Sequence, residues 1–197
     1  MVALIVGLTV NRVLSERHLT NSPELIDAGV ILLPQGRAMP ELQMKDEDGE
    51  TISLDSLQGQ WSLLFFGYTF CPDICPTTLA QLRQIKNQLP KDAAERLQVY
   101  LVSVDPDRDT PAQLKQYLGY FDKSFKGLTG PVETLEKFST AVSIPFIPAD
   151  TSQPNYTVQH SGNLAVIGPD GVLRGFIRAP LNTEKLVQQL PKLLRQS

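Results

Sequence analysis

The apolar residues of this chain fall into short unbroken runs and into stripes with helical spacing. Residues 61–66 and 99–104 form two apolar runs bounded by polar residues, glycine or proline, which predicts strands buried on both faces. Between them, apolar residues recur every three or four positions, which predicts an amphipathic helix ending near Leu89: Leu79, Leu82, Ile85 and Leu89. Strand, helix and strand in this order predict a right-handed βαβ unit with parallel strands.

Capping residues and prolines predict the helices, loop and hairpin of the C-terminal half. Thr110 and Pro111 predict the start of a helix that reaches Tyr120, and Pro131 that of a helix to about Val142. Residues 143–156 carry three prolines and no periodicity, which predicts a loop. A hairpin at residues 164–167 and 172–177 and a last helix follow; Asn182 is expected to cap this helix and Pro191 to kink it.

The N-terminal half predicts a β-hairpin extension after an apolar start. Short strands are expected at residues 30–33, 42–44 and 51–54, with an Asp-Gly turn at Asp48 and Gly49. Residues 16–25 are polar and predict an irregular or weakly helical linker.

Residues 1–10 are almost wholly apolar but shorter than the about 20 residues of a membrane span, and no basic segment precedes them. We interpret them as the outer end of a membrane anchor; the alternative is an amphipathic or core segment. Arg12 and Arg17 follow, although the positive-inside rule would place such a flank in the cytoplasm. The expected organisation is an anchor end and linker at residues 1–28, then one domain at residues 29–197.

The order of elements predicts an α/β, thioredoxin-like fold: a central mixed sheet flanked by helices. In open α/β sheets, sites lie beyond the carboxyl ends of the strands. This rule places Cys71 and Cys75, which follow the first buried strand, at the expected site. Two other loops are expected to reach it: the one after Val104 and the one that ends at His160.

Composition narrows the possible functions. The 197 residues fit one domain with an ample core, and a net charge of -3 without a Lys/Arg cluster argues against a nucleic-acid partner. The chain has two cysteines, and the loop that a Cys71–Cys75 bridge would close is too short to stabilise much by chain entropy. Their role is therefore expected to be reactive rather than structural.

The cysteine pair is compatible with a dithiol, a disulfide or a metal clamp. The N-terminus of the following helix favours the thiolate form at both positions. The alternative is two small core residues without chemistry.

Two histidines are present, His18 in the linker and His160 directly before the hairpin, so His160 is the candidate third ligand. Two thiolates and an imidazole form a soft, three-coordinate set that suits copper. Structural zinc would require a fourth protein ligand, and Asp73 would be a hard ligand among soft ones.

Four motifs in this order resemble the Sco/SenC family, over roughly residues 35–195: Phe70-Cys71-Pro72-Asp73-Ile74-Cys75-Pro76, residues 102–111 (VSVDPDRDTP), residues 127–130 (GLTG), and a late histidine before residues 167–171 (IGPDG). The family comprises membrane-tethered thioredoxin-fold copper proteins that help to assemble the dinuclear copper site of cytochrome c oxidase. By position, Cys71, Cys75 and His160 match its copper ligands. The chain departs from the family where Gln159 replaces a frequent acidic residue before the histidine. Asp105 resembles the family's loop aspartate, but a carboxylate that ends a strand before a proline turn is an equal interpretation.

The resemblance implies a copper chaperone that carries Cu(I) or Cu(II) to the copper-bearing subunit of cytochrome c oxidase and exchanges copper with another periplasmic chaperone. It also implies a location on the periplasmic face of the bacterial inner membrane, anchored by the N-terminus, rather than the mitochondrial equivalent.

The main alternative is a thiol-disulfide oxidoreductase in which Cys71 and Cys75 form the redox pair and reduce cysteines of the oxidase subunit or another partner. A thioredoxin-like peroxidase is disfavoured, because no Thr-x-x-Cys pattern is present. A copper or redox sensor stays open.

Overall fold

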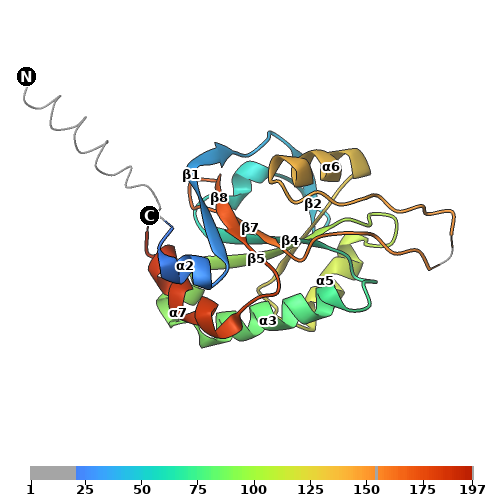
Figure 1. The fold of residues 1–197 in the computed structure, drawn as a ribbon. Coiled ribbons are helices and arrows are strands. Elements are labelled where there is room, and N and C mark those ends of the chain that lie inside the picture. The colour runs from blue at the N-terminus through green and yellow to red at the C-terminus, as the bar shows by residue number, and fades with distance from the viewer. Residues whose placement is uncertain (1–20, 154, 197) are drawn as a thin grey trace, which may run out of the picture.

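A computed structural model describes residues 21–153 and 155–196 (Figure 1). In this part of the chain, eight strands form one sheet in the order β1-β8-β7-β4-β5-β6-β2-β3. The strands are β1 (Val30–Ala38), β2 (Gln43–Asp46), β3 (Thr51–Ser53), β4 (Trp61–Gly67), β5 (Leu97–Ser103), β6 (Lys126–Thr129), β7 (Leu164–Ile167) and β8 (Val172–Ile177).

Helices cover both faces of the sheet. In Figure 1, α3, α5 and α7 lie below the sheet and α6 lies above it. The helices are α2 (Pro23–Asp27), the 3-10 helix η1 (Leu54–Leu57), α3 (Ile74–Gln88), α4 (Lys91–Ala94), α5 (Pro111–Gly119), α6 (Val132–Ala141) and α7 (Thr183–Leu194). Thr110 and Asn182 cap α5 and α7 as predicted, and α7 continues through Pro191.

The centre of the sheet positions the predicted site. All seven residues of β4 are buried, as the apolar run predicts. β4 pairs in parallel with β5 and antiparallel with β7, and α3 connects β4 to β5. The prediction of a thioredoxin-like fold with a central mixed sheet between helices is therefore confirmed. Because β4 and β5 are parallel, the loops after them emerge at the same edge.

The N-terminal strands belong to this same sheet. β2 and β3 form the predicted hairpin, β2 also pairs with β6, and β1 pairs with β8 at the opposite edge. The expected extension is thus not separate from the central sheet: its strands supply partners to edges that would otherwise expose unpaired backbone groups. β1 runs beyond the predicted strand to Ala38 and across Pro34, which an edge strand tolerates, and its register shifts between Leu32 and Arg37.

Part of the predicted linker packs on the domain. Ser22 caps α2, and Leu25 and Ala28 are buried in the core. The predicted anchor at residues 1–10 and His18 lie outside the described residues. None of the helices in the described part of the chain is long and apolar enough to cross a membrane.

Candidate metal centre

Cys71 lies in the turn between β4 and α3. Its backbone N–H donates to the carbonyl of Tyr68 at 3.3 Å, and its side chain is buried, with 8% of the residue exposed. The sulfur of Cys71 in turn accepts the backbone N–H of Cys75 at 3.4 Å. Since this N–H belongs to the first turn of α3, the sulfur lies at the positive end of the helix, as predicted.

Cys75 is the second residue of α3 and is fully buried. Its sulfur accepts the backbone N–H of Tyr68 at 3.5 Å, and it packs against Gly67, the last residue of β4. A Cβ on Gly67 would lie 2.7 Å from this sulfur, closer than any side chain can approach. Gly67 is therefore a site residue that sequence reasoning missed; its place between an apolar run and the cysteine turn is the one available signal.

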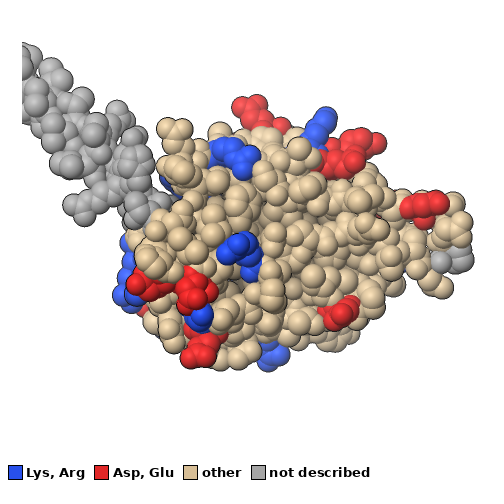
Figure 2. Space-filling model, in the orientation of Figure 1, with Lys and Arg blue, Asp and Glu red and all other residues tan. Residues whose placement is uncertain are grey.

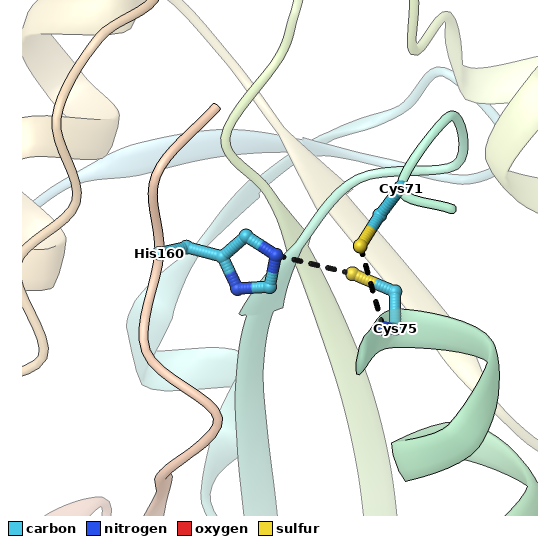
Figure 3. A group of neighbouring side chains, drawn as sticks. All are labelled: Cys71, Cys75 and His160. Carbon is cyan, nitrogen blue, oxygen red and sulfur yellow. Dashed lines mark hydrogen bonds between the residues drawn. The ribbon is translucent and has the colours of Figure 1, made fainter. Parts of the chain in front are cut away.

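His160 reaches the cysteines from the long segment between α6 and β7. Figure 3 shows its imidazole pointing toward Cys75, and its Nε2 lies 3.4 Å from the sulfur of Cys75. The rings of Phe65 and Tyr68 contact the imidazole edge-on, with centroid distances of 5.8 and 5.6 Å. The ring therefore lies between two aromatic side chains of the β4 region.

The tautomer of His160 follows from its other ring nitrogen. Nδ1 lies 3.2 Å from the carbonyl oxygen of Ser161, and a carbonyl can only accept, so Nδ1 carries the proton and donates it. Nε2 then presents its lone pair to the sulfurs, as a metal-ligating imidazole must. The backbone of Ser161 thus orients the ring here, while Gln159 is exposed.

The three predicted ligands converge. The sulfurs of Cys71 and Cys75 and a ring nitrogen of His160 all lie within 4.8 Å of one another (Figure 3). Neither Asp73 nor Asp105 belongs to this group. Asp105 is instead buried and bonded to Arg108 and Tyr156, as described below.

The two thiols differ in acidity. The hydrogen bond from the Cys75 thiol lowers the pKa of Cys71 to about 4, with further help from the backbone N–H groups of Asp73 and Cys75. Burial raises the pKa of Cys75 above its usual value, and the negative sulfur of Cys71 raises it further. At neutral pH the pair is therefore one thiolate and one thiol. The prediction that both positions favour the thiolate is wrong for Cys75, because its burial outweighs the effect of the helix N-terminus. Both cysteines are free.

This arrangement supports two chemistries. Two sulfurs and an imidazole within 4.8 Å of one another form a soft ligand set for a single metal ion. No carboxylate from residues 21–153 or 155–196 joins this group, which disfavours hard cations. A thiolate beside a buried thiol is also the arrangement of a redox pair, in which the first sulfur attacks and the second resolves.

The sequence is similar to one protein family and to a relative whose name includes copper binding. The sequence model of the SCO1/SenC family matches residues 33–195. A putative copper-binding protein of Stutzerimonas stutzeri is 51% identical over 170 residues, which cover 86% of this chain and 83% of that protein.

Two solved structures, both described as ScoI with copper bound, resemble the fold. The protein from Bradyrhizobium japonicum is 32% identical, with a TM-score of 0.67 and coverage of 79% of this chain and 98% of that one. The protein from Arabidopsis thaliana is 26% identical, with a TM-score of 0.73 and coverage of 81% and 99%.

Proposed function

The chain belongs to the SCO1/SenC family, and on this basis we propose that it binds copper through Cys71, Cys75 and His160 and delivers it to the dinuclear copper site of cytochrome c oxidase during assembly. One observation carries the proposal: these three side chains, from two distant parts of the chain, bring two sulfurs and one nitrogen within 4.8 Å of one another. Copper is the cargo of this function.

Each ligand has a separate role in loading. Cys71 is already a thiolate at neutral pH and makes the first bond to an incoming ion. Cys75 follows and loses its proton, which the bound positive charge makes favourable. The Nε2 of His160 completes the set without a proton loss, because this nitrogen carries the lone pair.

Delivery requires that a partner reach the ligands. The described chain exposes five large apolar side chains, and three of them adjoin the site: Phe70 precedes Cys71, Ile74 precedes Cys75, and Ile147 bridges to Gln159 before His160. We name Phe70, Ile74 and Ile147 the apolar rim. Exposed apolar groups gathered around a site are typical of a docking surface.

The same loops expose only acidic charges. Asp73, Asp107 and Asp150 are exposed, whereas Arg108 is half-buried and paired with Asp105. In Figure 2, the side of the molecule where these loops lie likewise shows acidic but no basic side chains. These exposed carboxylates attract copper cations and favour partners with basic surfaces.

The proposed partners are the copper-bearing subunit of cytochrome c oxidase and a second periplasmic copper chaperone. The proposed location is the periplasmic face of the inner membrane, with the N-terminus as anchor.

A transfer assay tests the function. The copper-loaded protein is mixed with the isolated copper-binding domain of the oxidase subunit, and the metal in each is measured after separation. We expect wild type to transfer copper and His160→Ala to lose at least about tenfold in copper affinity and in transferred copper. Equal transfer by the two proteins would remove His160 from the function.

Dithiol exchange is a second candidate function, favoured by the unequal acidity of the two thiols. The Cys71 thiolate attacks a disulfide of the partner and releases one partner thiolate, giving a mixed disulfide. The Cys75 thiol then gives its proton to the partner thiolate released first, and its sulfur attacks Cys71 and displaces the second partner thiolate. The partner thereby gains two electrons and a Cys71–Cys75 disulfide forms. Since exchange needs no imidazole ligand, His160→Ala should keep it within about twofold, whereas Cys75→Ser should stop at the mixed disulfide.

A further inference from the structure

The position of His160 needs an explanation because its segment has little regular structure. From the end of α6 at Ala141 to the start of β7 at Leu164, the described residues contain one isolated bridge, between Ile147 and Gln159, and no helix or strand. Main-chain hydrogen bonds within sheets and helices therefore do not fix the imidazole. Side-chain contacts with the rest of the domain must do so.

One arginine makes two of these contacts. The guanidinium of Arg108 lies over the ring of Tyr156, 3.7 Å from its centroid, and its Nη2 donates to the carbonyl oxygen of Tyr156 at 3.1 Å. Its Nε donates to Oδ2 of Asp105 at 2.5 Å. Asp105 closes the group, since its other oxygen accepts the hydroxyl of Tyr156 at 2.7 Å. We name Asp105, Arg108 and Tyr156 the arginine clamp.

The clamp also touches the cysteine turn. The guanidinium carbon of Arg108 lies 5.0 Å from the ring centroid of Phe70 and 5.6 Å from that of Tyr68. Tyr68 continues the connection, because its hydroxyl accepts the backbone N–H of Val158 at 3.3 Å and its ring lies edge-on to His160. The clamp therefore joins the turn that carries Cys71, the loop after β5 and the segment that carries His160.

The burial of the clamp makes it selective for arginine. Asp105 is buried and only 22% of the Arg108 side chain is exposed, so the charges are held largely away from water. A planar guanidinium can stack on Tyr156 while it donates to Asp105 and to a carbonyl, whereas a lysine ammonium is a point charge that cannot stack in this way. Replacement by lysine should therefore open the clamp although the charge is kept.

We propose that Arg108 is a positioning residue for the copper site. Through Tyr156 and Tyr68 it holds the imidazole of His160 close enough to the two sulfurs for all three to bind one metal ion. The inference rests on the proposed function, since it assigns Arg108 a role in the same ligand set. Asp105, the loop aspartate singled out in the sequence, acts within the clamp and not as a ligand.

Hydrogen exchange of the reduced, metal-free protein tests the clamp without copper. We expect Arg108→Lys to speed exchange of the Val158 amide and its neighbours at least about tenfold, because local opening of this segment becomes easier. Tyr156→Phe removes one hydroxyl and should have a smaller effect. Arg174→Lys is the matched control, since Arg174 also pairs with an aspartate, Asp170, in the turn at the far end of β7 and β8.

Copper titration tests the link to His160. We expect Arg108→Lys to weaken copper affinity about tenfold, as loss of a group that orients a metal ligand typically does, and to weaken the nitrogen signal in the spectrum of the copper-loaded protein while the sulfur signals stay. In a His160→Ala background the same change should cost less than about twofold, because the residue through which Arg108 acts is gone. A general loss of stability would lower affinity equally in both backgrounds.

The outcomes separate the two claims. Unchanged exchange of the Val158 amide in Arg108→Lys overturns the clamp, whatever copper does. So does an equal loss of copper affinity with and without His160. If His160→Ala alone leaves copper affinity unchanged, the proposed ligand set fails, and faster exchange in Arg108→Lys then still supports the clamp as a holder of this segment.

Discussion

At the scale of single residues, two identical thiols differ because their surroundings differ. Cys71 receives hydrogen bonds from the Cys75 thiol and from backbone N–H groups at the start of α3, which favour its charge. Cys75 is fully buried beside that charge, which disfavours a second one. A metal ion bound by both sulfurs therefore has to displace one proton and not two.

Proton release on copper binding measures this difference. Because the pKa of Cys71 is about 4 and that of Cys75 is raised, we expect about one proton to be released per copper between pH 7 and 8. Copper affinity should accordingly rise about tenfold per pH unit in this window, because the remaining proton on Cys75 leaves more easily as pH rises. Calorimetry in buffers of different protonation enthalpy gives the number of protons released per copper. A release of two protons would contradict the assignment of Cys71 as a thiolate and Cys75 as a thiol.

Gly67 provides a second test at this scale. Gly67→Ala would place a Cβ 2.7 Å from the sulfur of Cys75, so either the strand or the sulfur must move. We expect a loss of about 1–3 kcal/mol in the free energy of unfolding, from urea denaturation of the reduced protein, together with weaker copper binding. Gly119→Ala is the control, since a Cβ there meets no atom within 4 Å. This change should not lower the free energy of unfolding and should leave copper binding nearly unchanged.

At the scale of elements, the site depends on how the turns after β4 and β5 are tied together. Asp109, which is fully buried, accepts hydrogen bonds from the backbone N–H and hydroxyl of Thr69 and from the hydroxyl of Ser103. Thr69 lies in the cysteine turn and Ser103 ends β5. One carboxylate thus links the two turns next to the candidate metal centre.

Removal of this link should be costly. Asp109→Ala leaves the half-buried donors of Thr69 and the buried hydroxyl of Ser103 without their acceptor, so we expect a loss of about 1–3 kcal/mol in the free energy of unfolding. Asp107→Ala, two residues away and exposed, should change it by less than about 0.5 kcal/mol. Chemical denaturation of the wild type and the two variants measures these free energies of unfolding. Similar free energies for the two variants would show that the link does not stabilise the fold.

The elements that were predicted are those with a strong local pattern. β4, α3, β5 and the β7–β8 hairpin follow apolar runs, helical spacing and a Gly-Pro-Asp-Gly turn. β6 was missed because its four residues, KGLT, become a strand through pairing with β5 and β2, which no local pattern reports. The four-residue helix α4 and η1 were missed because they are too short for a period to show.

The sequence predicted the three candidate ligands from their donor atoms, but it did not predict the residues that hold these ligands in place. Two cysteines and one suitable histidine left a single soft ligand set, which the structure brings together. Gly67 and the arginine clamp were not found because their roles arise from contacts between segments far apart in sequence, such as Arg108 with Tyr156. The motif around Asp105 marked this residue in the sequence. Its hydrogen bonds to Arg108 and Tyr156 became visible only in the structure.

At the scale of the whole molecule, the candidate metal centre lies where the loops after β4 and β5 meet the segment that carries His160, and these loops carry the apolar rim and the exposed acidic side chains. Docking and metal binding should therefore be separable, because the three side chains of the apolar rim are not ligands: Phe70, Ile74 and Ile147. Copper affinity should depend on the three ligands alone, whereas the rate of copper transfer should depend on both the ligands and the apolar rim.

Substitution of the rim tests this separation. We expect Phe70→Ser combined with Ile147→Ser to slow copper transfer to the oxidase domain at least about tenfold, since truncation of a central apolar anchor of an interface costs about 2 kcal/mol, while copper affinity stays within about twofold. Tyr120→Ser is the control, because Tyr120 is another exposed large apolar side chain but follows α5 and does not adjoin a ligand. Equal slowing by Tyr120→Ser would mean that the rim has no special role.

The central claim is that Cys71, Cys75 and His160 together hold one copper ion. X-ray absorption at the copper edge, recorded on the reduced protein loaded with one equivalent, tests it most directly, with His160→Ala measured alongside. We predict two sulfur neighbours and one imidazole nitrogen in the wild type, and loss of the imidazole signal with both sulfurs kept in the variant. An identical spectrum for the two proteins would contradict the account.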